Sequence, residues 1–248
     1  MIFCFFVFYS SLCFAKLGIE EFGAVGEAFD PNIHNAVLHI EDEAYGDGEI
    51  VRNMPTVVDG TITVTTATDE QDFTNTDVSL REAFFTANML GATKIVFADG
   101  LTEITLNKQI AFNSLVGVTL TVDGGSDIII KGAGTDRLLN YGGSGTLMLT
   151  NMTLDGSNAN VSNGGIIYAS TTGKLQIADV TIQNGSATGS GGAIYANKVV
   201  LDMDHVIFQD NKAASGGALY INANTKIDLN DVSFLNNTAT ADGGAVYL

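Results

Sequence analysis

Apolar and polar residues alternate in short segments along most of the chain. Residues 61–65 read Thr-Ile-Thr-Val-Thr, and further strand-like segments follow at 94–97 and 103–106. A period of two places every second side chain on one face, so these segments are predicted to be half-buried β-strands. From there to residue 248, short strands alternate with turns rich in Gly, Asp and Asn, and the pattern predicts no second helix.

One stretch follows a helical period instead. Four apolar residues spaced at i, i+3, i+4 and i+7 predict an amphipathic helix over 79–89; they are Leu80, Ala83, Phe84 and Ala87. Asp77 or Ser79 is expected to cap its first turn, and Gly91 is expected to end it. We expect this helix to close the N-terminal end of the strand array.

The last third of the chain is a repeat. A segment of the form Gly-Gly-Ala-apolar-Tyr begins at Gly191, Gly216 and Gly243, with a looser copy at Gly164. The separations of 27, 25 and 27 residues are typical of solenoids, whose coils bury their apolar faces only against neighbouring coils. The second glycines, Gly192, Gly217 and Gly244, complete pairs expected at a corner where the backbone adopts conformations closed to other residues.

Other positions recur with the same period. An apolar column with spacings of 28, 26 and 26 residues is formed by Leu154, Ile182, Phe208 and Phe234. Each is predicted to point into the core about 4.8 Å above its predecessor. Just past this column come Asn184, Asn211 and Asn237, at turn positions where stacked amides can form hydrogen bonds along the axis.

These patterns divide the chain into three parts. Residues 1–15 are apolar, residues 16–54 are strongly acidic, and residues 57–248 form an all-β parallel solenoid of about five or six coils. The chain stops in the first strand of a coil without a polar cap. We therefore expect the natural protein to continue, and we expect the open strand edges to favour self-association.

Composition narrows the function. The net charge is −17, and the arginines are Arg52, Arg81 and Arg137. A nucleic-acid backbone is bound by clustered Lys and Arg, so nucleic acid is not an expected partner. Both cysteines, Cys4 and Cys13, lie in the first fifteen residues, so removal of that segment would leave no disulfide and no zinc–thiolate site.

The apolar segment 1–15 is too short to span a bilayer and ends in Cys-Phe-Ala before Lys16. Small residues at these positions suit signal-peptidase cleavage after Ala15, which predicts secretion. The alternative is a mis-assigned start codon that reads upstream sequence.

Two family resemblances follow from motifs in the solenoid part. Residues 63–88 contain Ser79, Leu80, Arg81, Glu82 and Ala83, and they resemble the opening module of secreted bacterial β-helix proteins named for a Cys-Ser-Leu-Arg-Glu-Ala motif; Val78 replaces the cysteine. The Phe-x-x-Asn and Gly-Gly-Ala pairs resemble chlamydial polymorphic outer-membrane proteins. Together these resemblances imply a right-handed parallel β-helix over 57–248, at the cell surface or outer membrane or secreted. They also imply adhesion to an unidentified surface ligand, a protein or a glycan.

The acidic part resembles a different family. Residues 16–51 look like the entry to the β-domain of GrpE, the nucleotide exchange factor of DnaK-type chaperones; the matching residues are Gly26, Glu27, Phe29, Asp30, Pro31, Asn32, His34, Ala36 and Val37. This resemblance implies a DnaK-type partner and a cytoplasmic location. Exchange requires a dimer stalk and a complete β-domain, which 16–51 does not contain, so we expect no exchange activity. Such a short segment buries too little apolar surface to fold alone, and we expect it to be disordered or loosely packed on the first coil.

An enzyme is the third function considered, because several parallel β-helix proteins are polysaccharide lyases or hydrolases. One repeat column contains Asn151, Asp179, His205 and Asp231, which stacks a histidine between two carboxylates. Asn and Asp are also usual turn residues, and we interpret the column as structural. No catalytic, cofactor-binding or metal-binding residues are therefore predicted. The leading hypothesis is a non-enzymatic, adhesin-like scaffold.

Overall fold

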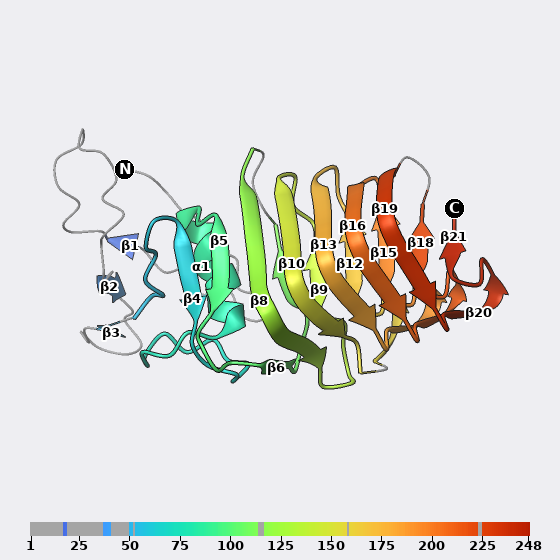
Figure 1. Cartoon of the computed structure of the whole chain (residues 1–248). Helices are drawn as coiled ribbons and strands as arrows, with labels where there is room; N and C mark the ends of the chain where they lie inside the picture. The colour runs from blue at the N-terminus through green and yellow to red at the C-terminus, as the bar shows by residue number, and fades with distance from the viewer. Residues whose placement is uncertain are drawn as a thin grey trace.

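The computed structural model describes residues 17–18, 37–40, 50–51, 53–113, 117–157, 159–222 and 225–248. From residue 53 onward the strands wind into successive coils that stack along one axis (Figure 1). Apart from the short hairpin contact between Val58 and Thr61, every strand pairing in this part is parallel. The predicted all-β, right-handed parallel β-helix with one short N-terminal helix is confirmed.

Three parallel sheets form the sides of the solenoid. The eight-stranded sheet contains β4 (Thr61–Val64), β5 (Lys94–Phe97), β6 (Glu103–Leu106), β8 (Thr119–Gly132), β10 (Thr146–Asp155), β13 (Lys174–Gln183), β16 (Val200–Gln209) and β19 (Lys226–Leu235). The six-stranded sheet contains β7 (Ile110–Phe112), β9 (Leu139–Tyr141), β12 (Ile167–Ser170), β15 (Ile194–Asn197), β18 (Leu219–Ile221) and β21 (Val246–Tyr247). The four-stranded sheet contains β11 (Asn160–Asn163), β14 (Ser186–Ser190), β17 (Lys212–Ser215) and β20 (Thr238–Asp242).

The core lies between the sheets. It consists of columns of side chains, in which residues at the same position of successive coils stack on one another. The register pairs Leu154 with Ile182, Ile182 with Phe208, and Phe208 with Phe234. The Phe208 and Phe234 rings stack with centroids 5.1 Å apart and planes 5° from parallel. In strands that have a neighbour on both sides, such as β13 and β16, inward residues alternate with outward ones along each straight part of the strand. The core is therefore a stack of apolar layers one strand spacing apart.

Each coil turns at residues in the left-handed backbone region. In the coil that begins with β13, Asp179, Asn184 and Gly191 have φ of 56°, 55° and 68°. Asn, Asp and Gly are the residues that adopt this region most readily, which explains why they recur at the corners. The glycine pair has a second role at Gly192, because a Cβ there would clash with the carbonyl oxygen of Gly217 in the next coil.

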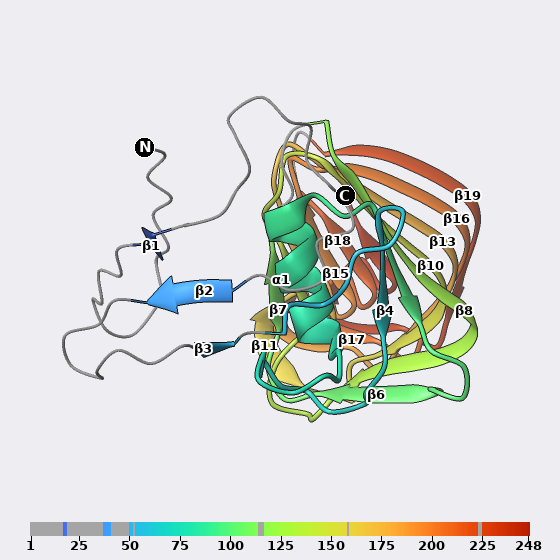
Figure 2. The same ribbon diagram turned by 90° about the vertical axis from the view of Figure 1, so that its left-hand side faces the viewer.

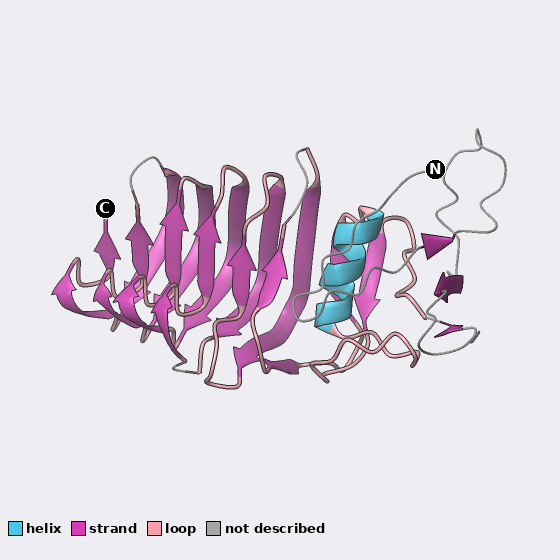
Figure 3. Cartoon of the chain, turned by 180° about the vertical axis from the view of Figure 1, so that it is seen from behind, coloured by secondary structure: helices cyan, strands magenta, loops and turns pink. Residues whose placement is uncertain are grey.

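Helix α1 (Leu80–Leu90) lies across the N-terminal end of the solenoid (Figure 2). Ser79 is its N-cap and Gly91, with φ of 69°, is its C-cap. The buried face packs onto the first strands through Leu80, Ala83 and Phe84, and the Phe84 ring meets Phe112 edge-on at 5.3 Å. The view from behind shows the helix standing before the first strands (Figure 3). The helix thus covers an end of the core that would otherwise face water.

The last coil has no neighbour on its outer side among the described residues. Leu201 and Met203 in β16 are 0% and 1% exposed, whereas their register partners in β19, Ile227 and Leu229, are 42% and 37% exposed. The difference arises because a solenoid residue is covered from both axial directions, and β19 is covered from one.

Before the solenoid, three short strands pair as an antiparallel sheet in the order β1 (Leu17–Gly18), β2 (Val37–Ile40) and β3 (Ile50–Val51). The predicted signal segment 1–15 lies outside the described residues. So do the GrpE-like positions Gly26, Glu27, Phe29, Asp30, Pro31, His34 and Ala36; Val37 begins β2. The expectation that 16–54 is disordered or loosely packed stays a prediction.

Candidate functional site

The Ser-Leu-Arg-Glu-Ala motif builds the start of helix α1. The Ser79 hydroxyl accepts a hydrogen bond from the Glu82 N–H, and the Glu82 carboxylate accepts one from the Ser79 N–H. This capping box satisfies backbone donors that the first turn of a helix leaves without partners. Leu80 and Ala83 point into the core and are 1% and 0% exposed. These four residues therefore have structural explanations.

Arg81 fastens the helix to the first coils. Its guanidinium forms two hydrogen bonds with Asp69, at 2.8 and 2.9 Å, and donates to the carbonyl oxygens of Lys108 and Gln109 at 2.7 and 3.1 Å. Asp69 also accepts from the Asn107 N–H, and its side chain is only 3% exposed. A bidentate pair of this kind fixes both position and angle, so Arg81 orients the helix on the solenoid.

Glu82, like Asp69, is a buried carboxyl at this end of the molecule. Desolvation raises its pKa above the ordinary glutamate value, although hydrogen bonds from the Ser79 and Asp72 N–H groups act in the opposite direction. A raised pKa in a cleft is one mark of a general acid. Here both carboxylate oxygens of Glu82 accept backbone hydrogen bonds at the helix start. We therefore assign Glu82 to the capping box and not to acid–base catalysis.

The column suspected of catalysis forms a corner of the eight-stranded sheet. Its residues are in the left-handed region, with φ of 56°, 56°, 52° and 48° for Asn151, Asp179, His205 and Asp231. His205 lies 3.1 Å from Asp204 through Nδ1 and 3.5 Å from Asp231 through Nε2, and all three side chains are about half exposed or more. The positive φ explains the residue types at this corner without a catalytic role.

The asparagine ladder differs in one position from the expectation. Asn211 is 1% exposed; its amide donates to Asn237 Oδ1 at 2.9 Å and to the Ile182 carbonyl at 3.0 Å. Its own oxygen accepts from the Gly185 N–H at 2.8 Å. The register therefore places Gly185, not Asn184, opposite Asn211. Asn184 is the residue before Gly185 in the same turn; it has a positive φ, and its amide donates to Asp155.

A column of tyrosines runs along the outer face of the six-stranded sheet. Centroids of neighbouring rings lie 5.1 Å apart for Tyr168 and Tyr195, 5.3 Å for Tyr195 and Tyr220, and 4.8 Å for Tyr220 and Tyr247. The ring planes are within 6° of parallel. The guanidinium of Arg137 covers the free face of Tyr168 at 5.1 Å. Sequence reasoning recognised these tyrosines as repeat residues but not as an outward stack, because that requires the register.

The two outer faces carry different charges. Strands of the six-stranded sheet contain no charged residue. The eight-stranded sheet has charged side chains tied to neighbouring coils, as in the pairs of Lys94 with Asp123 at 2.9 Å and Lys174 with Asp202 at 2.8 Å. These pairs and amide donors lower the pKa of Asp202 below the ordinary aspartate value, although desolvation acts in the opposite direction. Ionic ladders thus occupy one face and aromatic stacking the other.

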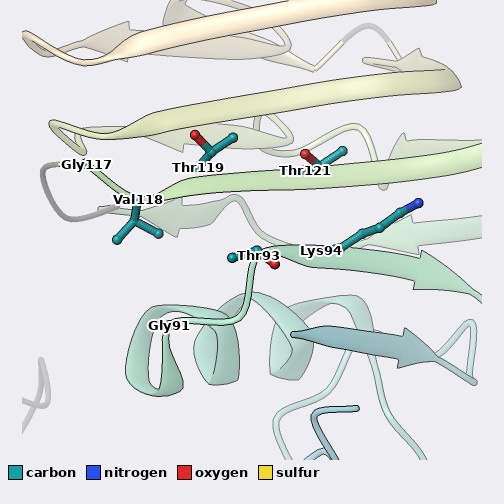
Figure 4. A pocket seen from close by; sticks show the side chains of 7 residues that line it. All are labelled: Gly91, Thr93, Lys94, Gly117, Val118, Thr119 and Thr121. Atoms are coloured by element: carbon teal, nitrogen blue, oxygen red, sulfur yellow. The ribbon is translucent and has the colours of Figure 1, made fainter. Parts of the chain in front are cut away.

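A hollow of about 630 Å³ opens between the coil of β5 and the coil of β8 (Figure 4). Its lining residues are Gly91, Thr93, Lys94, Gly117, Val118, Thr119 and Thr121. The hollow exists because β5 begins at Lys94, opposite Thr121, so β8 extends two residues past it. The lining includes three threonine hydroxyls and one ammonium group but no carboxylate, imidazole or thiol, so it brings together no acid–base pair.

A second hollow of about 310 Å³ lies beside the helix and is lined by Asp69, Glu70, Gln71, Arg81, Asn107 and Lys108. The charged pair at its centre, Arg81 and Asp69, is already bound to itself and to backbone groups. Within the residues that the structure describes, no group of three or more His, Cys, Asp or Glu side chains has the geometry to hold a metal ion. The same residues include no helix able to span a membrane.

Comparison with known families gives two matches in different parts of the chain. The family model of the Chlamydia polymorphic membrane protein repeat matches residues 205–222 and 231–248. These two matches lie in successive coils, from the second half of β16 to the end of β18 and from the second half of β19 to the end of β21. The family model of GrpE matches residues 11–55.

Several curated GrpE proteins match a short N-terminal stretch of the chain. Protein GrpE of Clostridium acetobutylicum is 65% identical over 37 residues, which are 15% of this chain and 18% of that protein. Protein GrpE of Clostridium beijerinckii is 73% identical over 33 residues, 13% of this chain and 16% of that protein. Protein GrpE of Bacillus subtilis is 51% identical over 39 residues, 16% and 21% of the two chains.

The chain thus spans less than a quarter of the length of these relatives. No solved structure matches this chain. Taken with the fold, the matches show that a GrpE-like segment precedes a β-solenoid that contains repeats of the Chlamydia polymorphic membrane protein type.

Proposed function

We propose that the β-helix is a non-enzymatic scaffold at the cell surface or outer membrane, or secreted, that presents its outer faces for adhesion. The observation that carries this proposal is the match of two successive coils to the polymorphic membrane protein repeat. A rigid solenoid supports the same role, because its stacked coils create long, regular surfaces on which many weak contacts can act together.

The assignment of the repeat residues to structure also supports a scaffold. The corner column around His205 adopts a backbone conformation that favours its residue types, and Arg81 and Glu82 are bound at the helix start. The motifs that first suggested chemistry are therefore accounted for by folding. The surface ligand of such a scaffold would be a protein or a glycan.

Surface shaving tests the location. Intact cells that make the protein are treated briefly with trypsin, and released peptides are compared with those from lysed cells. We expect the solenoid peptides 175–198 and 213–226, which follow Lys174 and Lys212, in the intact-cell fraction. A cytosolic protein serves as the control for lysis. Recovery of the solenoid peptides only after lysis would contradict the proposal.

Bead binding tests adhesion separately. Beads coated with the purified chain are expected to bind cell or matrix surfaces that uncoated beads do not bind, and soluble chain should compete. If the protein is found at the surface but binds no protein or glycan array, the surface location stands and the proposed adhesion is wrong.

A chaperone role is a second candidate, favoured by the matches over residues 11–55. The matched stretch covers only 18% of the C. acetobutylicum protein, so most of that protein has no counterpart in the match. We expect no acceleration of nucleotide release from a DnaK-type chaperone by the purified chain. Acceleration at micromolar concentration, lost on deletion of residues 16–54, would establish this function in place of the scaffold.

A further inference from the structure

We propose that the tyrosine column, formed by Tyr168, Tyr195, Tyr220 and Tyr247, is a site of oxidative cross-linking that joins neighbouring coils through dityrosine bridges. The column has the geometry that phenol coupling needs. Parallel, in-register strands set each ring directly above the ring of the preceding coil, with centroids 4.8 to 5.3 Å apart. The ortho carbons of adjacent rings therefore lie about one strand spacing apart, and coupling requires the two rings to tilt toward each other about their side-chain torsions.

The rings are also accessible. In β12 and β15 the apolar residues on either side of the tyrosine are fully buried, while Tyr168 and Tyr195 lie on the opposite face and are half-buried. Because stacked rings cover each other's faces, they present their edges and hydroxyls to solvent. The Tyr195 hydroxyl accepts a hydrogen bond from the Asn222 amide at 3.2 Å. The phenol proton of Tyr195 is not used in this bond.

The coupling reaction requires a one-electron oxidant, which a haem peroxidase with hydrogen peroxide supplies. Two phenols each lose one electron and one proton, and hydrogen peroxide takes up both electrons and both protons to give two water molecules. The two phenoxyl radicals then form one carbon–carbon bond between their ortho carbons. Transfer of each ortho hydrogen to oxygen restores both phenols. No cysteine follows Cys13, so a disulfide within the coils cannot provide the same link.

The column also predicts how many bridges form and in what order. When each tyrosine couples only once, four rings in a row give at most two bridges, Tyr168 to Tyr195 and Tyr220 to Tyr247. The guanidinium of Arg137 lies over the Tyr168 ring, and a positive charge there opposes removal of an electron. The bridge between Tyr220 and Tyr247 is therefore expected first.

A buried aromatic pair provides an internal contrast. Tyr141 is 0% exposed, and its ring stacks on Phe112 at a centroid distance of 6.3 Å. Phenylalanine has no phenol to oxidise, so Tyr141 is expected to remain unmodified under conditions that couple the outer column.

The experiment treats the full chain at low concentration with peroxidase and hydrogen peroxide, isolates the monomer by size-exclusion chromatography, and maps bridges by trypsin digestion and mass spectrometry. We expect a link between peptides 213–226 and 227–248 first, followed by a link between 138–174 and 175–198. Fragment ions of 138–174 distinguish Tyr168 from Tyr141. Bridges that occur only in dimers, or that involve Tyr141, would overturn the proposal.

Two double variants sharpen the test because they contain the same number of tyrosines. Tyr168→Phe with Tyr195→Phe leaves the adjacent pair Tyr220 and Tyr247, and is expected to keep one bridge. Tyr195→Phe with Tyr247→Phe leaves Tyr168 and Tyr220 in the column, two coils apart, and is expected to give no bridge between column tyrosines in the monomer fraction. Tyr9, Tyr45 and Tyr141 are present in both variants and contribute the same background. Phenylalanine preserves the ring stack in both, and circular dichroism checks the fold. Equal fluorescence from the two variants would rule out coupling within the column.

Discussion

The N-terminal end of the solenoid and its repeated coils are held together by different means. At the N-terminal end, single residues without counterparts elsewhere fasten a helix, as Arg81 does through Asp69 and two backbone carbonyls. In the coils, the same contact recurs at each level, as in the apolar column that contains Ile182 and Phe208. The comparison shows that one set of packing contacts recurs from coil to coil. The contacts at the N-terminal end occur once, so each depends on its own residues.

The difference extends to the response to acid. Burial raises the pKa of Glu82, so its ionisation opposes folding as the pH rises through that raised value. Asp123 and Asp202 in the eight-stranded sheet have lowered pKa values, so their contribution to stability is present at neutral pH and is lost in strong acid. Glu82 and the two aspartates thus contribute to the pH dependence of stability with opposite signs.

The largest effect is expected from crowding the glycine corner. Gly192→Ala forces a Cβ against the carbonyl oxygen of Gly217 and backbone atoms of Lys212, and is predicted to lower the free energy of unfolding by about 3 kcal/mol. Gly244 is the equivalent residue of the last described coil, and a Cβ there meets no atom within 4 Å. Gly244→Ala is therefore the matched control and should change stability little. Similar urea midpoints for the two variants would show that coils do not approach closely at this corner.

A slightly smaller effect is expected from releasing the helix. Arg81→Met leaves the Asp69 carboxylate, 3% exposed, without its cation, and is predicted to cost about 2 to 3 kcal/mol. The control is Lys131→Met, which breaks an exposed pair with Glu103 and should cost less than about 1 kcal/mol. If both variants unfold at the same denaturant concentration, the guanidinium does not anchor the helix.

The asparagine ladder comes next. Asn211→Ala removes the partners of the Gly185 N–H and the Ile182 carbonyl, and leaving buried polar groups unpaired is predicted to cost about 1 to 3 kcal/mol. Asn230→Ala, at an exposed position in β19, should change stability by less than about 0.5 kcal/mol. Thermal melts of both variants provide the measurement. A neutral Asn211→Ala would mean that water or a shifted turn satisfies those groups.

The smallest effect is expected from Asp123, at the junction of the two regions. Burial by itself would raise its pKa, but hydrogen bonds from Asn151 and Lys94 lower the pKa below the ordinary value of 3.8. Its stabilising contribution is therefore present above that value and lost as the pH falls through the lowered pKa. The wild-type chain should melt above Asp123→Asn at pH 7, and the gap should close in acid below about pH 3.8. A gap that stays constant with pH would exclude ionisation of Asp123 as the cause.

The solenoid could be predicted from the sequence because its signals repeat. The spacing of Leu154, Ile182 and Phe208 gives the coil length, and stacked positions confirm one another. The N-cap at Ser79 and the C-cap at Gly91 follow from local chemistry, because both depend on residues within one turn of the helix.

Contacts between distant residues could not be predicted in this way. Nothing local indicates that Asp69 pairs with Arg81, because both belong to the unique end of the molecule and no second copy reveals the pattern. The ladder position of Asn184 is wrong by one residue. Asn211 and Asn237 follow Phe208 and Phe234 by three residues, and the same count from Ile182 leads to Gly185, so the sequence itself contains the correct position. The outward direction of Tyr195 depends on which face of the short strand β15 meets the core, and Ile194 and Ala196 take the inward positions.

The most direct test of this two-region account is hydrogen–deuterium exchange of the full chain compared with Arg81→Met. The account predicts faster exchange in 80–112, where the helix and the first coils meet, with unchanged protection in 174–209, because distant coils are held by their own neighbours. An equal loss of protection in both regions would contradict it, since the helix contacts would then stabilise the whole solenoid as one unit.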